Sequence, residues 1–324
     1  MTERFSQADV DAWARDGAVI LPRFFSDEEM APARTDFDTL YAADAPEGGE
    51  PVDLKVDGKV VMVEPAQFKR SHEMPFQCSP ALNLLALHPA LIAFARAALG
   101  TQDVLLYASQ SWAKFTGDTD YDQPFHLDFL NHTLLVPGER PQDRTISFMI
   151  YATDVTEGHG AIRYAPKPQG DRICGTDRPA IPNPAQQDAL HGIERSGVAP
   201  AGSIFAYATD VYHRGSNLTI PRARRYTLTA SYKTAGNDRV GYTAWPRQAQ
   251  ASPWPLIFDN ATPHQLACLG VPPPGDPFWT ERTLARAQLR YPGWDLGAWR
   301  SALARTPRDR WSGGAALRQE GASS

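Results

Sequence analysis

Three residues in the middle of the chain have side chains that bind transition metals. His126 and Asp128 are separated by one residue, and His213 follows much further along the sequence. Alternate residues of a β-strand face the same side, so a strand through Phe125–Phe129 would present His126 and Asp128 together. Two imidazoles and one carboxylate that leave coordination positions open form the ligand set of non-haem Fe(II) oxygenases. A neighbouring antiparallel strand that carries His213 would complete this set.

His132 leaves other interpretations open. A His-x-Asp pair on a strand is by itself more often a hydrogen-bonded pair than a metal site. His132 falls on the face of His126 and Asp128 if the strand stays regular through Asn131. It could then be a ligand, a group that supports a ligand, or a surface residue. A zinc hydrolase that uses His126, Asp128 and His132 is therefore one alternative.

A second segment, Pro221–Tyr232, could bind a carboxylate. It begins with arginines and continues as a β-rich run in which Arg225 and Thr227 share one face, while Arg224 points to the other. A guanidinium and a hydroxyl two residues apart can bind a carboxylate together. We expect Arg225 and Thr227 to do so, with Arg224 in their place if a β-bulge reverses the alternation. A basic edge strand that faces solvent is the other interpretation.

The surrounding sequence changes from helical to β-rich and back. Capping serines and apolar spacing predict helices over 6–16 and from Ser26 to about Ala43, and Pro89 divides an apolar helical stretch over 80–99. Short β-rich segments then follow from residue 103. They are VLLYASQSWAKF, FHLDFLNHTLLV, TISFMIYATDV, GAIRYAP, GSIFAYATD and RYTLTASYKT. Helical propensity returns at 263–268, 280–290 and 295–305. This order predicts an all-β core, an antiparallel sandwich or barrel, with flanking helices.

Composition excludes several classes of protein. The 324 residues carry a formal net charge of −5, which argues against nucleic acid or an anionic membrane as the main partner. No apolar run reaches the roughly 18–20 residues of a membrane span, and no signal peptide is visible. Three widely spaced cysteines argue against a disulfide framework. We therefore expect a cytoplasmic protein with a small-molecule partner, and the sequence leaves a homodimer open.

These residues together resemble the phytanoyl-CoA dioxygenase family. The resemblance covers roughly residues 5–235 and rests on His126-Leu-Asp128, on His213 in FAYATDVYHRGSNLT, and on an arginine eleven or twelve residues later. It also includes the opening FSQADVDAWARDGAVILPRFFSDEEM and the segment TISFMIYATDVTEGHGAIRYAP. The family implies a double-stranded β-helix, a jelly-roll or cupin-like fold. It also implies Fe(II) as cofactor and 2-oxoglutarate and O₂ as cosubstrates.

The resemblance assigns roles residue by residue. His126, Asp128 and His213 would hold iron, and Arg225 would bind the distal carboxylate of 2-oxoglutarate. Lys114, which shares a strand face with Gln110 and Trp112, is a further candidate for that pocket. The implied reaction is hydroxylation of an unactivated C–H bond of a small molecule, with release of succinate and CO₂. A halogenase would need glycine or alanine in place of Asp128, and an inactive β-sandwich binding protein would not need these residues.

We expect a single catalytic domain over 1–311. It would consist of N-terminal helices in 1–100, a β-helix core in 101–235 and a C-terminal extension in 236–311, followed by a disordered tail in 312–324. The chain departs from the family at Ala165–Gly170, where many members have a Pro-Gly-Ser-His loop. Because such loops often border the substrate, the sequence does not identify the substrate.

Overall fold

A computed structural model shows how the chain folds. It describes residues 4–44, 49–51, 55–56, 59–60, 66–118, 122–138, 140–175, 178–241, 245 and 253–305. The predicted tail over 312–324 lies outside these residues.

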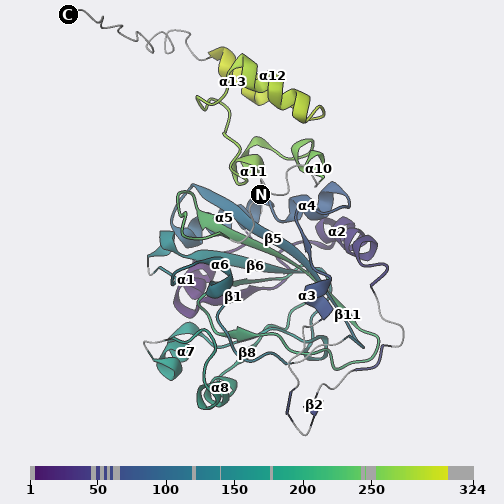
Figure 1. The fold of residues 1–324 in the computed structure, drawn as a ribbon, viewed down its shortest axis with the longest axis vertical. Coiled ribbons are helices and arrows are strands. Elements are labelled where there is room, and N and C mark those ends of the chain that lie inside the picture. Colours follow the sequence, from purple (N-terminus) through teal and green to yellow (C-terminus); the bar gives the residue numbers. More distant parts are fainter. Residues whose placement is uncertain are drawn as a thin grey trace, which may run out of the picture.

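A six-stranded antiparallel sheet forms the centre of the molecule (Figure 1). In spatial order its strands are β1 (Ala18–Leu21), β9 (Ile204–Tyr207), β6 (Thr145–Tyr151), β11 (Arg224–Thr234), β5 (Val104–Phe115) and β4 (His72–Glu73). The long strands β5 and β11 pair from Arg224 opposite Phe115 to Thr234 opposite Val104, with one irregularity between Ser231 and Tyr232. The predicted antiparallel β core is confirmed, and β5 has the predicted bounds.

A second, three-stranded sheet packs against the inner face of the first. Its order is β10 (His213–Arg214), β7 (Arg163–Tyr164) and β8 (Arg195–Ser196). Buried side chains of both sheets, among them Tyr164 and Phe205, form one apolar cluster between them. This two-sheet arrangement is the expected double-stranded β-helix.

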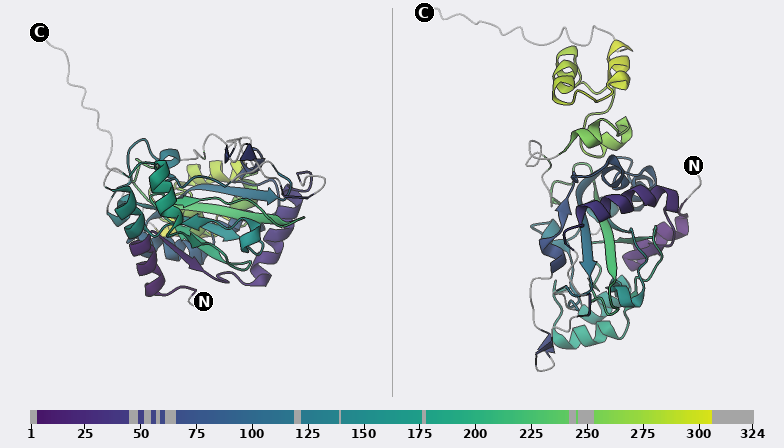
Figure 2. Two further views of the ribbon diagram at one scale, coloured as in Figure 1. Left: turned by 90° about the horizontal axis from the view of Figure 1, so that it is seen from below. Right: turned by 90° about the vertical axis from the view of Figure 1, so that its right-hand side faces the viewer.

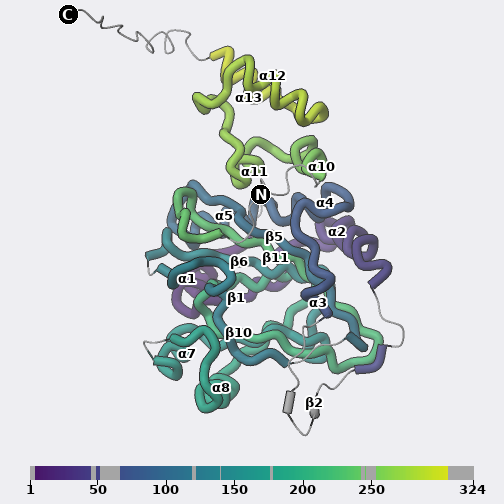
Figure 3. Tube along the Cα trace, in the orientation of Figure 1, coloured from purple at the N-terminus to yellow at the C-terminus, as the bar shows by residue number. Residues whose placement is uncertain are grey.

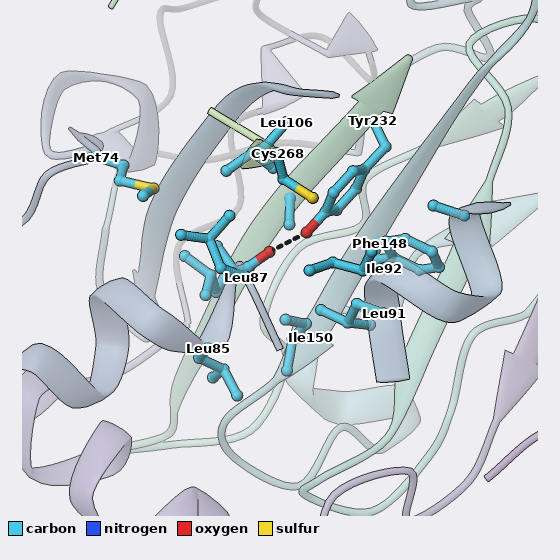
Figure 4. Close-up of a cluster of buried hydrophobic side chains, with 14 of the residues drawn as sticks. Met74, Leu85, Leu87, Leu91, Ile92, Leu106, Phe148, Ile150, Tyr232 and Cys268 are labelled. Atoms are coloured by element: carbon cyan, nitrogen blue, oxygen red, sulfur yellow. Dashed lines mark hydrogen bonds between the residues drawn. The ribbon is translucent and has the colours of Figure 1, made fainter. Parts of the chain in front are cut away.

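Helices of the N-terminal half cover the outer face of the large sheet (Figure 2). They are α1 (Gln7–Asp16), α2 (Asp27–Leu40), α4 (Pro80–Leu85) and α5 (Pro89–Leu99). Ser6 and Ser26 cap α1 and α2 as predicted. Figure 4 shows the core beneath α5, where Leu91 and Phe148 pack near Tyr232, whose hydroxyl donates to the Ala86 carbonyl over 2.5 Å. Strand alternation thus sends apolar residues outward to these helices and leaves polar residues on the inner face.

One sequence expectation needs correction at α4 and α5. Together they form a 20-residue stretch, Pro80–Leu99, that is long and apolar enough to cross a membrane by length and composition alone. The statement that no apolar run reaches this length is therefore wrong. In this fold the stretch belongs to the buried core, since Leu82, Leu91, Ile92 and Phe94 have no exposed surface.

The C-terminal helices stand beyond the sheet (Figure 3). They are α10 (Pro255–Phe258), α11 (Pro263–Ala267), α12 (Glu281–Arg290) and α13 (Gly297–Arg305), and three match the predicted helices. Trp279, Trp294 and Trp299 are buried among them. The remaining short elements are β2 (Lys55–Val56), β3 (Lys59–Val60), α3 (Ala66–Lys69), α6 (Phe129–His132), η1 (Pro141–Asp143), η2 (Glu157–His159), α7 (Lys167–Cys174) and α8 (Pro184–His191).

The segment FHLDFLNHTLLV is not the strand that the sequence predicts. His126 makes only an isolated bridge to His213, and helix α6 begins at Phe129. Asp128 already has helical backbone angles, φ −79° and ψ −11°, so the extended run ends one residue after the bridge. His132 therefore lies on a helix and not on a strand face shared with His126.

Candidate active site

Two histidines from distant parts of the sequence lie directly opposite each other. His126 and His213 form an antiparallel bridge in which their backbones exchange hydrogen bonds of 3.0 and 3.1 Å. Side chains of such a pair project to the same face of the sheet. The ring centroids are 4.6 Å apart. The bridge thus brings the two imidazoles together, which their spacing in the sequence does not show.

Backbone carbonyls orient both rings. His126 Nδ1 lies 2.9 Å from the Pro124 carbonyl, and His213 Nδ1 lies 3.0 Å from the Val211 carbonyl. Because a carbonyl only accepts, each Nδ1 carries the hydrogen and each Nε2 keeps its lone pair. Both Nε2 atoms approach Asp128, at 3.6 Å from Oδ1 for His126 and 3.3 Å from Oδ2 for His213. One ligand atom from each of the three residues lies within 4.8 Å of the others.

The charges of this cluster suit a cation. Burial opposes ionisation of Asp128, but the charge and hydrogen bond of His213 outweigh it and lower the pKa of the carboxyl. Burial lowers the pKa of His126, and the neighbouring charge of His213 adds to this effect. For His213 burial acts in the same direction, but Asp128 overcomes it and raises the pKa. Fe(II) would displace the proton that Asp128 favours on His213, and both Nε2 atoms and the ionised carboxylate would then be donors of the kind that Fe(II) takes, so the residues fit the metal.

A cationic end of the same cavity comes from β11 and β5. Arg225 and Thr227 line it, and Lys114 lies opposite Arg225 in the strand register. Both cations are buried, with 8% of Arg225 and 2% of Lys114 exposed. Arg225 donates to the Gly160 carbonyl, and Lys114 Nζ donates to the Ser216 carbonyl over 3.0 Å. Two adjacent buried cations favour an anionic group at this end of the cavity, such as one carboxylate of 2-oxoglutarate.

Arg224 lies on the other side of the sheet. Its guanidinium is exposed, 3.0 Å from Asp38 and stacked over the Tyr226 ring. The irregularity in β11 comes only after Ser231, so nothing reverses the alternation at the arginines. Arg225, and not Arg224, therefore lines the same cavity as His126, Asp128 and His213.

The cavity between these groups has a volume of about 340 Å³. Residues of β5, β6, β9 and β11 form half of its wall. Apart from the residues above, those of the described part that line it are Gln67, Phe68, Ala108, Ser109, Gln110, Trp112, Gln123, Asn131, His132, Met149, Ile162, Tyr207, Gly215, Thr229 and Ser231. Ligand pockets span roughly 300–1,000 Å³, so this cavity is small.

Several groups around the ligands are not apparent from the sequence. The Tyr107 hydroxyl lies 2.6 Å from His132 Nδ1, which holds that histidine outside the three-residue cluster. Burial and the charge of Asp128 raise the pKa of Tyr207, which lines the same cavity. Gln67 and Gln123 come from segments without strand periodicity, so no sequence pattern indicates them. Asp210 is the exception, because an acidic residue inside the apolar run before His213 indicates a buried carboxylate that needs a partner.

Comparisons with known proteins agree with this site. The family model described as phytanoyl-CoA dioxygenase matches residues 13–225. The ectoine dioxygenase of Bordetella parapertussis is 27% identical over 261 residues, which cover 72% of this chain and 78% of that protein.

Solved structures show the same fold. The EctD structure from S. alaskensis with 2-oxoglutarate and 5-hydroxyectoine has a TM-score of 0.54 and 18% identity, and the match covers 78% of this chain and 83% of that one. The 2-oxoglutarate-dependent (alpha ketoglutarate dependent) carbocyclase SnoK from nogalamycin biosynthesis has a TM-score of 0.52 and 20% identity, with 72% and 85% covered.

Proposed function

We propose that His126, Asp128 and His213 hold the iron of this chain, which belongs to the phytanoyl-CoA dioxygenase family. The protein is an Fe(II)- and 2-oxoglutarate-dependent dioxygenase. It hydroxylates an unactivated C–H bond of a small molecule and releases succinate and CO₂. The observation that carries the assignment of the ligands is the orientation of the two imidazoles, whose Nε2 atoms converge with the Asp128 carboxylate.

Each protein group has a separate task in this reaction. Iron with bound 2-oxoglutarate supplies the oxidising chemistry with O₂. Arg225 and Thr227 bind the distal carboxylate of 2-oxoglutarate, and Lys114 adds positive charge behind them. The Pro124 and Val211 carbonyls keep the imidazoles in the metal-binding tautomer.

The structure also disfavours the hydrolase interpretation. That alternative needs His132 as a ligand beside His126 and Asp128. His132 instead lies on α6 with its Nδ1 at the Tyr107 hydroxyl, and Arg225 would have no purpose in a hydrolase.

An anaerobic titration with Fe(II) and 2-oxoglutarate tests the proposal. Chelation of Fe(II) by a 2-oxo acid gives a weak visible charge-transfer band, which we expect in the wild-type protein. His126→Ala should abolish the band, and Arg225→Ala should raise the 2-oxoglutarate concentration needed to form it by about 30-fold or more, as expected when one partner of a buried charge pair is removed. Arg224→Ala is the matched control on the same strand and should titrate like the wild type. A folded, iron-binding wild-type protein without the band would contradict the proposal.

A further inference from the structure

We propose that the substrate is recognised through an uncharged amide-like or similarly polar group, which hydrogen-bonds to Gln67 and Gln123 beside the metal cluster. This inference rests on the proposed function, and it names the class of substrate for that site.

The charges that line the cavity are already assigned. Besides its three histidines, the described residues of the cavity wall include one carboxylate, Asp128, and one permanent cation, Arg225. Asp128 belongs to the metal. Arg225 belongs to 2-oxoglutarate, and so does Lys114, which is buried beside Arg225 on β5 and donates to the Ser216 carbonyl. A charged substrate group buried here would find no counter-charge among these residues, and an unpaired buried charge is strongly unfavourable. The remaining polar wall consists of amides and hydroxyls, which suit a neutral polar group.

Gln123 lies three residues before His126 and joins the two ligand segments through hydrogen bonds to Gly215. Its backbone N–H donates to the Gly215 carbonyl over 2.9 Å, and its side-chain Oε1 accepts the Gly215 N–H over 3.0 Å. The acceptor end of the amide is therefore occupied, and the group is held in one orientation. None of the described residues accepts from its Nε2, whose hydrogens are donors at the cavity. A substrate carbonyl or hydroxyl oxygen is the complementary group.

Gln67 supplies the second amide at the cavity, from helix α3. Only 7% of the residue is exposed, it lines the cavity, and its side chain makes no hydrogen bond to the residues that the structure describes. The amide atoms of this otherwise buried residue therefore face the cavity, where a bound ligand can hydrogen-bond to them. It offers both a donor and an acceptor, which match the C=O and N–H of an amide.

The aromatic wall and the volume limit the rest of the molecule. Phe68 and Trp112 meet edge to face with centroids 5.4 Å apart, and both line the cavity. The cavity of about 340 Å³ must hold 2-oxoglutarate as well as the substrate. The part of the substrate that enters is therefore small, with an apolar face toward Phe68 and Trp112.

A pair of probes that differ in one carboxylate tests this inference. 2-Pyrrolidinone is an uncharged cyclic amide, and 5-oxoproline is the same ring with a carboxylate. Each is titrated anaerobically into the protein loaded with Fe(II) and 2-oxoglutarate, and the perturbation of the visible band gives its affinity. We expect 2-pyrrolidinone to bind at least about tenfold more tightly than 5-oxoproline, and ectoine, which also carries a carboxylate, to bind weakly.

Variants connect the result to the two amides. Gln67→Leu and Gln123→Leu should each weaken 2-pyrrolidinone by about tenfold while the band itself still forms. Gln67→Glu should disfavour 5-oxoproline further, and Gln169→Leu, at an exposed glutamine of α7, should change nothing. The inference is wrong if ectoine or 5-oxoproline binds as tightly as 2-pyrrolidinone, or if 2-pyrrolidinone does not perturb the band. It is also wrong if neither Leu variant weakens the binding of 2-pyrrolidinone. Absence of the band in every titration would instead contradict the proposed function.

Discussion

Asp210 provides a test of how the second histidine is held in place. This buried carboxylate lies in the loop before His213 and is surrounded by three cations. Lys167 Nζ lies 2.8 Å from Oδ2, Arg178 Nη1 lies 3.4 Å from Oδ2, and Arg144 Nη2 lies 3.6 Å from Oδ1. Arg178 also donates to the Asp210 carbonyl. Asp210→Asn preserves the shape of the side chain and removes the charge that holds these groups together.

The expected loss of stability follows from this geometry. Removing one partner of a buried ion pair costs about 3–5 kcal/mol. The value here should be nearer about 2–4 kcal/mol, because Lys167 and Arg178 are partly exposed and keep Asp171 as a partner. An unfolding entropy of about 2.1 cal/mol/K per residue over roughly 300 residues converts this loss into a fall in Tm of about 3–6 °C. The Val211 carbonyl that orients His213 follows Asp210 directly, so Fe(II) affinity should fall about tenfold.

The pH dependence of this effect has a definite sign. Burial opposes ionisation of Asp210, but Lys167 and Arg144 outweigh it and lower the pKa below its ordinary value of 3.8. The carboxylate therefore contributes its stability above that value and loses it as the pH falls through the folded-state pKa. The difference in stability between wild type and Asp210→Asn should be full at neutral pH and should shrink below about pH 4.

Asp171→Asn is the matched control for thermal unfolding and Fe(II) titration. Asp171 contacts Lys167 and Arg178 at 3.3 and 2.9 Å, but it is more exposed and lies outside the loop. Its loss should cost no more than about 1 kcal/mol and leave Fe(II) affinity unchanged. The reasoning is refuted if Asp210→Asn unfolds within about 1 °C of the wild type, or if both variants lose the same stability and Fe(II) affinity.

Two further predictions concern backbone geometry and acid stability. Gly160 has φ +67°, and a Cβ there would lie 2.4 Å from the Ser216 carbonyl oxygen. Because of this strain and clash, Gly160→Ala should destabilise the fold by about 2–3 kcal/mol in thermal unfolding. It should also weaken 2-oxoglutarate binding, because the Gly160 carbonyl accepts from Arg225, and unchanged binding would contradict this. A hydrogen bond from Arg4 lowers the pKa of Glu29 to about 2, so the pair stabilises the fold above about pH 4.5 and loses this contribution toward pH 2. Arg4→Gln should therefore destabilise at neutral pH but not near pH 2, and a difference independent of pH in urea unfolding would exclude this cause.

The sequence could predict which face of the sheet the residues of the proposed cosubstrate site share, because side chains alternate along these strands. β11 keeps a two-residue period against β5 from Arg224 to Ser231, so Arg225 and Thr227 could be assigned to one side and Arg224 to the other. The same logic failed at His126 and Asp128, where the ladder consists of a single bridge. Asp128 reaches the metal cluster through a helical turn, which places the residue near His126 without strand geometry.

The groups that surround the ligands are set by contacts between distant segments. Tertiary packing determines that Tyr107 contacts His132 and that Asp210 contacts Lys167, Arg178 and Arg144. The periodicity of the sequence carries no information about such contacts. A charged residue inside an apolar run indicates that a partner is required, but the sequence does not identify that partner.

The difference between residues of the regular sheets and residues of the surrounding segments explains why the family predicts the cosubstrate and not the substrate. The residues that we propose for iron and 2-oxoglutarate lie on the sheets and their bridge, whose positions the fold determines. Gln67 and Gln123 instead come from a one-turn helix and from the segment before the His126 bridge, where changes of sequence leave the β-helix intact. Relatives with the same sheets can therefore act on different molecules, and two amide side chains are a better guide to the substrate than the name of the family.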